Sequence, residues 1–451
     1  MGRRTRKTAP LGITLDAGAP QTIHWQIREQ IRRAILERRL ALGALLPSSR
    51  LLAAELGCSR GTVLTAIEQL IAEGYLVSRT ASGVSVAPDL PDEMLISPPS
   101  LGPPPNPATG PAILPDRTIA MLARVTDIGA PEPNEPPIAF PIGQPDRQAF
   151  PFPLWARFLE QDWRKPAWQV AGSPHPFGHL GLRQAIASYL GAARGFACDP
   201  GAVVVTSGVR QSVSLFARVA LEAGDQAWIE EPGYPGMVEA LAASEVEATA
   251  VPIDESGFAL NAALAAAPDA RLAIVAPSHH FPLGTVLSLQ RRLALLSWAE
   301  RTRGWIIEDD FDGEYRYAGR PLAPLRALDW GGRVAYLGSF SKLLFPTLRL
   351  SYLILPEALV SAAEAIMPWI STPAPLLGQG ALARFIADGH LTSHLRRTRL
   401  LYASRQQALL EAVDRHLKGL MAVEPDSGGM HVVAKPDSNS RLVPRVIHNT
   451  G

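Results

Sequence analysis

The 451-residue sequence has little cysteine, almost no net charge and no long apolar run. Its two cysteines, Cys58 and Cys198, are too few for a disulfide framework, which excludes disulfide-held secreted scaffolds and suits a reducing cytoplasm. The basic start, Met1 to Lys7, is not followed by the apolar segment of a secretory signal. No apolar run reaches membrane-spanning length. We therefore expect a cytoplasmic protein without a membrane partner.

Metal-ligand spacing is also missing. Ten histidines include the pair His279-His280, but no H-E-x-x-H arrangement surrounds them. Core or loop positions explain these histidines more simply, so we expect no metal site. The length exceeds that of one ordinary domain, and a hydrophobic content of 47% suffices for a large core.

Basic residues are concentrated at the front of the chain. Residues 1–87 contain 12 Lys and Arg and 6 Asp and Glu, a difference of +6, whereas the whole chain carries +1. A basic module on a near-neutral protein suits nucleic acid, because phosphate neutralisation supplies much of the binding free energy. A small helical bundle with solvated arginines would show the same charge, so charge alone leaves both interpretations open.

The same segment predicts three helices and a hairpin. Apolar residues recur at helical spacing in the first helix, Ser48 and Ser59 are placed to cap the second and third, and Gly57 ends the second. The predicted helices are residues 23–36, 48–57 and 60–74, and the hairpin strands are residues 75–78 and 84–87. Helix, tight turn and capped helix followed by a hairpin is the plan of a winged helix-turn-helix.

Prolines dominate the stretch that follows. Residues 88–137 contain 14 prolines, a density that disfavours helix and sheet. Such composition predicts a stiff, extended, partly disordered tether between two modules.

Further along, a lysine stands between small hydroxyl residues and an arginine. The run Ser339-Phe340-Ser341-Lys342 is followed by Arg349. A lysine amine forms a Schiff base with a carbonyl cofactor, and hydroxyls with a guanidinium bind phosphate by charge-assisted hydrogen bonds. The pattern suits pyridoxal 5′-phosphate, although a lysine near serine and arginine is more often a solvated surface residue.

Three upstream segments favour the same cofactor. Residues 305–310 predict a buried strand that ends in carboxylates, and a carboxylate keeps a pyridine nitrogen protonated. Residues 203–211 predict a strand, a Ser-Gly turn and a helix start, whose free N–H groups bind anions. Tyr234 lies in a tight turn from which it could stack on a flat ring. Each segment alone has a purely structural explanation, but their order together favours a cofactor site.

Strand and helix patterns alternate through this region. The strands are expected at residues 203–206, 227–230, 271–276, 304–308, 333–337 and 350–355, and helices include residues 182–192 and 289–301. Strands that are continuous apolar runs are buried on both faces, which predicts an α/β fold with a mostly parallel central sheet. The ligand should lie at the carboxyl ends of these strands.

These motifs, in this order, resemble a fold-type I, class I aminotransferase over residues 141–431. The resemblance implies that Lys342 forms the Schiff base with pyridoxal 5′-phosphate and that Asp309 pairs with its pyridinium. It implies the other cofactor contacts as well: phosphate contacts from Ser339, Ser341, Arg349, Ser207, Gly208 and Val209, and ring stacking by Tyr234.

The run from Leu46 to Val63 resembles the winged helix of the GntR family. That resemblance places Arg50 and Arg60 at phosphates and base edges, Ser59 and Thr62 at the start of the recognition helix, and the Ser82-Gly83 tip in the minor groove. In this order, the two modules resemble the MocR-type subfamily of GntR-family transcription regulators.

Four segments are accordingly expected: a winged helix-turn-helix over residues 20–87, a linker over 88–137, an aminotransferase-like domain over 138–435 and an irregular tail over 436–451. The resemblance implies a head-to-tail, domain-swapped homodimer that binds operator DNA and senses pyridoxal phosphate or an amino-acid-type effector. Two alternatives stay open, an active aminotransferase with a DNA-binding head and a degenerate scaffold that binds no cofactor.

Several positions depart from the aminotransferase pattern. Phe311 stands where a tyrosine usually bonds the phenolic oxygen of the cofactor, Arg210 replaces a glutamine, and Ser173 replaces an aromatic residue. The usual Gln-Phe-Pro-Thr-Gly is His280-Phe281-Pro282-Leu283-Gly284. The family continues well beyond the Ser427–Val433 motif, so we expect a truncated or altered C-terminus, an incomplete small domain and little turnover.

Overall fold

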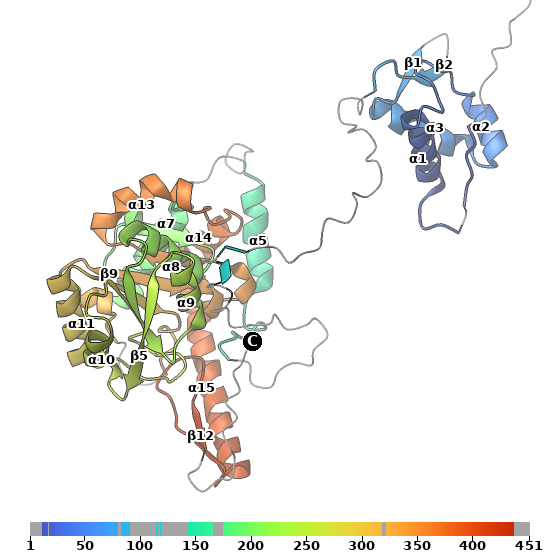
Figure 1. Ribbon diagram of the computed structural model, residues 1–451. Coiled ribbons are helices and arrows are strands. Elements are labelled where there is room, and N and C mark those ends of the chain that lie inside the picture. Colours follow the sequence, from blue (N-terminus) through green and yellow to red (C-terminus); the bar gives the residue numbers. More distant parts are fainter. Residues whose placement is uncertain are drawn as a thin grey trace, which may run out of the picture. The chain divides into compact units, whose positions relative to one another are not determined.

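The computed structural model describes residues 11–16, 18–79, 83–90, 142–165, 175–317 and 322–436, together with Leu114, Pro115, Thr118, Ile119 and Leu122. The chain divides into two compact units, an N-terminal unit of residues 1–112 and a C-terminal unit of residues 113–451 (Figure 1). Each unit has its own hydrophobic core. No helix among the described residues is long and apolar enough to cross a membrane.

The described residues of the N-terminal unit form three helices and a hairpin, as predicted. Its elements are α1 (Ile23–Leu36), α2 (Ser49–Leu56), α3 (Arg60–Ala72), β1 (Leu76–Arg79) and β2 (Gly83–Val86). Ile27 and Ile31 of α1 are fully buried in one cluster with Val63 of α3. The side chain of Ser48 accepts a hydrogen bond from Leu51 N at 3.3 Å at the start of α2. The helical period and the caps therefore act as the sequence indicates.

An eight-stranded sheet organises the C-terminal unit. Its strands are β3 (Val203–Thr206), β4 (Gln226–Glu231), β5 (Glu247–Asp254), β6 (Gly257–Phe258), β7 (Leu272–Val275), β8 (Trp305–Asp310), β9 (Val334–Ser339) and β10 (Ser351–Ile354). The spatial order is β3-β10-β9-β8-β7-β4-β5-β6. The consecutive pairs from β9 to β5 are parallel, whereas β10 is antiparallel to both of its neighbours, β3 and β9. The expectation of a mostly parallel sheet is confirmed.

Helices cover both faces of this sheet (Figure 1). On one face pack α5 (Phe152–Trp163), α7 (Leu180–Arg194), α10 (Leu260–Ala266), α11 (Leu289–Thr302), α14 (Gln379–Ala387) and the start of α15 (His390–His416). On the other pack α8 (Val209–Ala220), α9 (Pro235–Ala242) and α13 (Glu357–Ile370). The remaining elements are η1 (Pro200–Ala202), η2 (Leu325–Leu328), α12 (Phe340–Leu343), η3 (Pro346–Leu348), β11 (Met421–Val423) and β12 (Ala434–Pro436). Because successive strand residues face opposite sides, Val203 and Val204 belong to different clusters.

Some features differ from the expectations. Strands β5 and β6 are not among the predicted strands, because β5 has a single buried residue, Val251, and lacks the apolar run of the central strands. Lys435 and Pro436, for which no regular structure was expected, pair with β11. Helical backbone occurs at Thr118 and Ile119 within the Pro-rich stretch, where none was expected. Ser82, Ser173, most of the Pro-rich stretch and residues 437–451 lie outside the described residues.

Candidate cofactor cavity and nucleic-acid interface

A cavity of about 790 Å³ opens at the carboxyl edge of the sheet. Its size falls within the range usual for sites of cofactors and small ligands. The nine cofactor residues predicted from the sequence all line it: Ser207, Gly208, Val209, Tyr234, Asp309, Ser339, Ser341, Lys342 and Arg349. They lie at or just after the carboxyl ends of β3, β4, β8 and β9, in α12, and just after η3. These positions are up to 142 residues apart in the chain, and the sheet topology brings them together.

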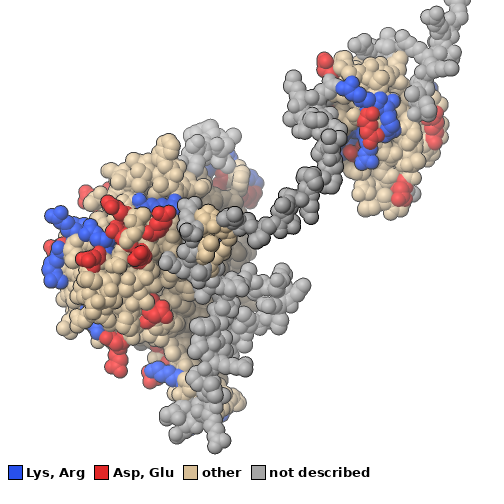
Figure 2. All heavy atoms as spheres, viewed as in Figure 1, with Lys and Arg blue, Asp and Glu red and all other residues tan. Residues whose placement is uncertain are grey.

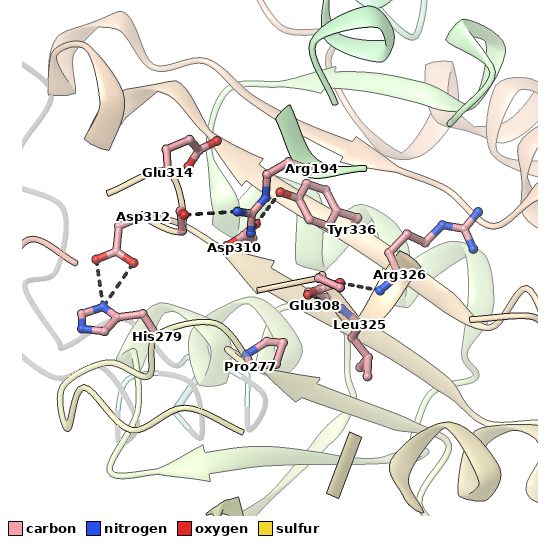
Figure 3. Close-up of polar contacts among 12 residues, drawn as sticks. Arg194, Pro277, His279, Glu308, Asp310, Asp312, Glu314, Leu325, Arg326 and Tyr336 are labelled. Atoms are coloured by element: carbon pink, nitrogen blue, oxygen red, sulfur yellow. Dashed lines mark hydrogen bonds and ion pairs between the residues drawn. The ribbon is translucent and has the colours of Figure 1, made fainter. Parts of the chain in front are cut away.

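Because side chains alternate along strand β8, its three carboxylates lie in different environments, and Figure 3 shows the contacts of two of them, Glu308 and Asp310. Glu308 accepts hydrogen bonds of 2.7 Å from the backbone N–H groups of Leu325 and Arg326. Asp310 contacts Arg194, whose guanidinium compensates its buried charge. Asp309, between them, has the opposite orientation and faces the cavity. Two of the three carboxylates are therefore structural, and one is available to a ligand.

Asp309 has the properties that a protonated pyridine nitrogen requires of its partner. Its Oδ1 atom is buried and has no hydrogen-bond partner among the described residues. Burial and the neighbouring carboxylates of Asp310 and Asp312 raise the pKa of Asp309 to about 7. An incoming N–H donor would relieve both the unpaired acceptor and the charge crowding. The side chain thus fits the ring nitrogen of pyridoxal phosphate.

Lys342 lies in the short helix α12, directly after β9. Its Nζ atom donates a 3.0 Å hydrogen bond to the carbonyl of Gly143. Burial lowers the pKa of Lys342, while Asp312 and Asp309 oppose that shift. Desolvation favours the neutral amine, which is the nucleophilic form that attacks a carbonyl.

An anion cradle lies at the start of helix α8. Gly208 is the N-cap of α8, and a Cβ atom placed there would stand 3.5 Å from Nη2 of Arg349. A helix N-terminus and a guanidinium therefore approach the same space, as a phosphate site requires. Arg349 adopts a left-handed backbone with φ of 50°, which is costly for a side chain of this kind. Such local strain is consistent with a position selected for ligand contact.

The aromatic residues around the cavity are less decisive. Tyr234 lines it at 41% exposure, so its ring is free to stack on a ligand, but that role stays a prediction. Phe311 and Phe281 also line the cavity, with ring centroids 6.4 Å apart. Neither phenylalanine donates a hydrogen bond, so this wall is apolar beside Asp309 and Lys342.

The cavity residues that sequence reasoning missed include Gly143, Glu230, Met430 and His431. Gly143 contributes a backbone carbonyl, for which no side-chain pattern exists. Burial raises the pKa of Glu230 to about 8, but its position before the Glu231–Gly236 turn gave no sign of this. Met430 and His431 belong to the Ser427–Val433 motif, which the sequence marks only as the point beyond which the family continues. The tertiary fold places both residues at the cavity.

In the N-terminal unit, the predicted nucleic-acid residues cluster at two helix starts. Ser59 caps α3 and accepts a 3.1 Å hydrogen bond from Thr62 N, and its hydroxyl lies 2.8 Å from that of Thr62. Arg60 Nε donates to Ser49 Oγ at 3.2 Å, which joins the starts of α2 and α3. Arg50 and Arg60 are exposed, and neither forms an ion pair with a described residue. Both guanidinium groups thus retain free donors for phosphate or base edges.

The hairpin tip is only partly described. Gly83 is exposed at the start of β2 with φ of +85°, a conformation that glycine adopts readily, and Ser82 lies outside the described residues. Figure 2 shows Lys and Arg side chains on the visible face of this unit, with Asp and Glu among them. The contacts of each residue with DNA stay predictions.

Two family models match the chain. Residues 24–86 match the bacterial regulatory proteins of the gntR family, and residues 142–447 match the aminotransferases of class I and II.

Curated relatives and solved structures agree with both models. The probable rhizopine catabolism regulatory protein MocR of Rhizobium meliloti is 38% identical over 94% of this chain and 83% of its own length. The HTH-type pyridoxine biosynthesis transcriptional regulator PdxR of Corynebacterium glutamicum is 34% identical over 98% of this chain and 90% of its own. The kynurenine aminotransferase of Pyrococcus horikoshii, solved in complex with PMP, has a TM-score of 0.61 and 26% identity over 71% of this chain and 80% of that chain.

Proposed function

The chain belongs to the GntR family of bacterial regulatory proteins and carries an aminotransferase class I and II domain, and from this premise we propose how it works. It is a transcription regulator that binds operator DNA through residues 20–87 and holds pyridoxal 5′-phosphate in the cavity of the C-terminal unit. There it responds to the cofactor, or to an amino-acid-type effector. Because it acts on DNA, we place it in the cytoplasm.

One observation carries the proposal. A half-buried lysine, a carboxylate with an oxygen that no described residue bonds, and a helix N-terminus with an arginine surround a single cavity, in a chain that also has a capped helix-turn-helix. When bound, the cofactor supplies an aldehyde that traps amines and a ring that withdraws electrons. Lys342 would hold the aldehyde carbon, Asp309 would keep the ring nitrogen protonated, and Arg349 with the Ser207–Val209 turn would hold the phosphate.

The body that carries this cavity is proposed to be a homodimer, as the family resemblance implies. Several large apolar side chains of the C-terminal unit are exposed and would be covered by a second copy: Phe152, Trp163, Leu180, Trp369 and Leu377. Light scattering should give twice the 48.5 kDa chain mass.

The test combines colour with DNA binding. The purified full chain should absorb visible light as a protein-bound pyridoxal phosphate adduct, and it should retain fragments selected from genomic DNA by binding. Titration with pyridoxal phosphate and then with individual amino acids and amines should change the affinity for the selected fragment. A colourless chain whose DNA affinity ignores all of these ligands would overturn the proposal.

A working aminotransferase with a DNA-binding head is the second candidate. The complete set of Lys342, Asp309 and the anion cradle favours it, whereas the apolar wall of Phe281 and Phe311 gives the phenolic oxygen no donor. Release of a keto acid from an added amino acid, with turnover rather than a single conversion, would establish this candidate.

A further inference from the structure

A buried histidine next to the cavity joins the turn after β8 to a distant segment of the chain. His279 follows β7, and only 4% of its side chain is exposed. Its Nδ1 lies 3.0 and 3.2 Å from the two carboxylate oxygens of Asp312, in the turn after β8 (Figure 3). Its Nε2 lies 3.2 Å from Oδ2 of Asp426. Both ring nitrogens therefore face carboxylate oxygens, which requires an N–H on each of them.

Asp426 belongs to residues 426–431, which we call the strap. Gly429 N donates to Tyr315 O at 2.6 Å, and Tyr317 N donates to Ser427 O at 2.8 Å. Arg316 and Gly428 form an antiparallel bridge. The backbone of the strap is thus laid along residues 315–317, a short extended segment downstream of β8.

The inner end of the strap reaches both the histidine and the cavity. Met430 N donates to Asp312 Oδ2 at 3.1 Å, the same carboxylate that faces His279. The Met430 and His431 side chains line the cofactor cavity. The ring centroid of His431 lies 4.6 Å from that of His279, and Nε2 of His431 is buried with no hydrogen-bond partner among the described residues. The position of two cavity residues therefore depends on the contacts around His279.

The backbone is adapted to this close approach. Gly429 has φ of +78°, and a Cβ atom there would stand 1.8 Å from Cε1 of His279. Gly284 has φ of +70°, and a Cβ atom there would stand 2.5 Å from Oδ2 of Asp426. Only glycine at positions 284 and 429 allows the strap and the loop that contains Gly284 to enclose His279 at this distance.

From these contacts we propose that His279 is a positioning residue of the cavity: by bridging Asp312 and Asp426, it fixes the strap and so places Met430 and His431 against the bound ligand. The inference deepens the proposed function, on which the ligand part of it rests. Nothing in the bridge requires His279 to touch the cofactor itself.

Charge supports the same conclusion. Burial alone would lower the pKa of His279, but the carboxylates of Asp312 and Asp426 outweigh it and raise the pKa to about 10. The imidazolium also depresses the pKa of Asp426 against the effect of burial. The groups around the bridge are Asp312 from the β8 turn, Asp426 and His431 from the strap, the adjacent His280, and Arg194 and Arg316 beside the hollow that His279 lines. Two carboxylates and one imidazolium thus form the bridge.

The same atoms also raise the question of a metal ion. Ligand atoms of His279, Asp312 and His431 all lie within 4.8 Å of one another. A metal ligand needs a free lone pair, whereas each nitrogen of His279 lies at hydrogen-bonding distance from a carboxylate oxygen. The geometry therefore favours the bridge, and chelation separates the two possibilities.

Hydrogen exchange of the strap tests the bridge without any cofactor. In the full chain freed of pyridoxal phosphate, the His279→Gln variant should exchange the amides of Gly429 and Met430 about tenfold faster, as expected when about one hydrogen bond is lost. Asp426→Asn removes the negative charge that faces Nε2 of His279 and should speed the exchange of the same two amides by a smaller factor. This second variant keeps the test valid if His279→Gln folds poorly. His416→Gln, at the exposed end of α15, is the matched control and should exchange like the parent.

A pH series supplies a readout that simple packing would not give. Strap protection, corrected for intrinsic exchange, should fall in the parent as the pH approaches 10 and stay flat in His279→Gln. Unchanged protection in both bridge variants would overturn the proposal. So would loss of protection on adding a chelator to the parent, because the cluster would then be a metal site.

The ligand part has its own measurement. Pyridoxal phosphate titrated by absorbance should bind His279→Gln several-fold more weakly than His416→Gln. If the parent binds no pyridoxal phosphate, the proposed function fails while the exchange result stands. If the strap loosens but the affinity is unchanged, the bridge does not position the cavity wall.

Discussion

Lys342 reaches the cavity from helix α12 and Asp309 from strand β8, so each tests a different part of the proposed site. Lys342→Ala removes the only proposed covalent anchor and should abolish borohydride-trapped pyridoxyl label on the corresponding peptide. Lys418→Ala, in an exposed pair with Asp414, should label like the parent. Peptide mapping gives the answer, and a pyridoxyl group on another lysine of the parent would refute the assignment.

Asp309→Asn keeps the size of the side chain but removes its charge. The charge-assisted hydrogen bond to the ring nitrogen should be lost, which costs about 1.5–3 kcal/mol, or roughly 10–100-fold in cofactor affinity. Asp254→Asn is a matched control, because the side chain of Asp254 is exposed and pairs with Arg291. Equal affinities for the two variants would exclude Asp309 as the partner of the ring.

His279 predicts a particular pH dependence of stability. Its pKa of about 10 in the folded chain exceeds the ordinary value of 6.5, so its contribution is complete below pH 6.5 and is lost as the pH rises towards 10. The free energy of unfolding of the C-terminal unit should therefore fall more steeply between pH 7 and 10 in the parent than in His279→Gln. Denaturant titrations at several pH values measure the difference, and parallel curves would contradict it.

Among the elements, recognition helix α3 combines a cap with an exposed cation. Arg60→Ala should weaken binding to the selected fragment by about 1–3 kcal/mol if a bidentate base contact is removed, and Arg50→Ala should also weaken it. Cofactor absorbance should be unchanged in both variants, because Arg50 and Arg60 lie in the N-terminal unit and the cavity lies in the C-terminal unit. Arg415→Ala in the C-terminal unit makes the same charge change and should bind the fragment like the parent at matched salt. Equal binding by all three variants would disprove the assigned interface.

The strap offers an element-scale test of close packing. Gly429→Ala and Gly419→Ala place a methyl group at nearly equal backbone angles, φ +78° and +79°. Within the described part of the chain, only the methyl group at 429 would meet another side chain, that of His279. Both substitutions should cost roughly 1–2 kcal/mol from the left-handed backbone. Gly429→Ala should cost distinctly more, as measured by thermal unfolding. Equal losses of stability in the two variants would show that the strap moves away from His279 at little cost, which would contradict this prediction.

At the scale of the whole molecule, two separate cores predict two unfolding transitions. Pyridoxal phosphate binds only the C-terminal unit in this proposal, so at 100 times its dissociation constant it should stabilise that unit by about 2.7 kcal/mol. Calorimetry should show one transition that rises with cofactor and one that does not. Lys342→Ala should leave both transitions insensitive to low cofactor concentrations, and a shift of both in the parent would contradict independent units.

The sequence by itself determined the elements and the chemical types of the candidate site. Helical spacing, caps at Ser48 and Ser59, and apolar runs marked α1 to α3 and the central strands, because those signals act over a few neighbouring residues. The lysine, carboxylate and Ser-Gly turn were likewise recognisable, since each lies at the end of a predicted strand.

Only the tertiary structure decided which side chains meet. Asp309 faces the cavity, whereas Glu308 and Asp310 do not. The pleat of β8 alternates the side chains, and the backbone N–H groups of Leu325 and Arg326 and the guanidinium of Arg194 bind the other two carboxylates. The bridge from Asp312 through His279 to Asp426 joins segments as much as 147 residues apart. No local sequence pattern marks such a contact, because the tertiary fold brings distant segments together. In the weakly polar interior, buried charges are costly unless they pair with an opposite charge.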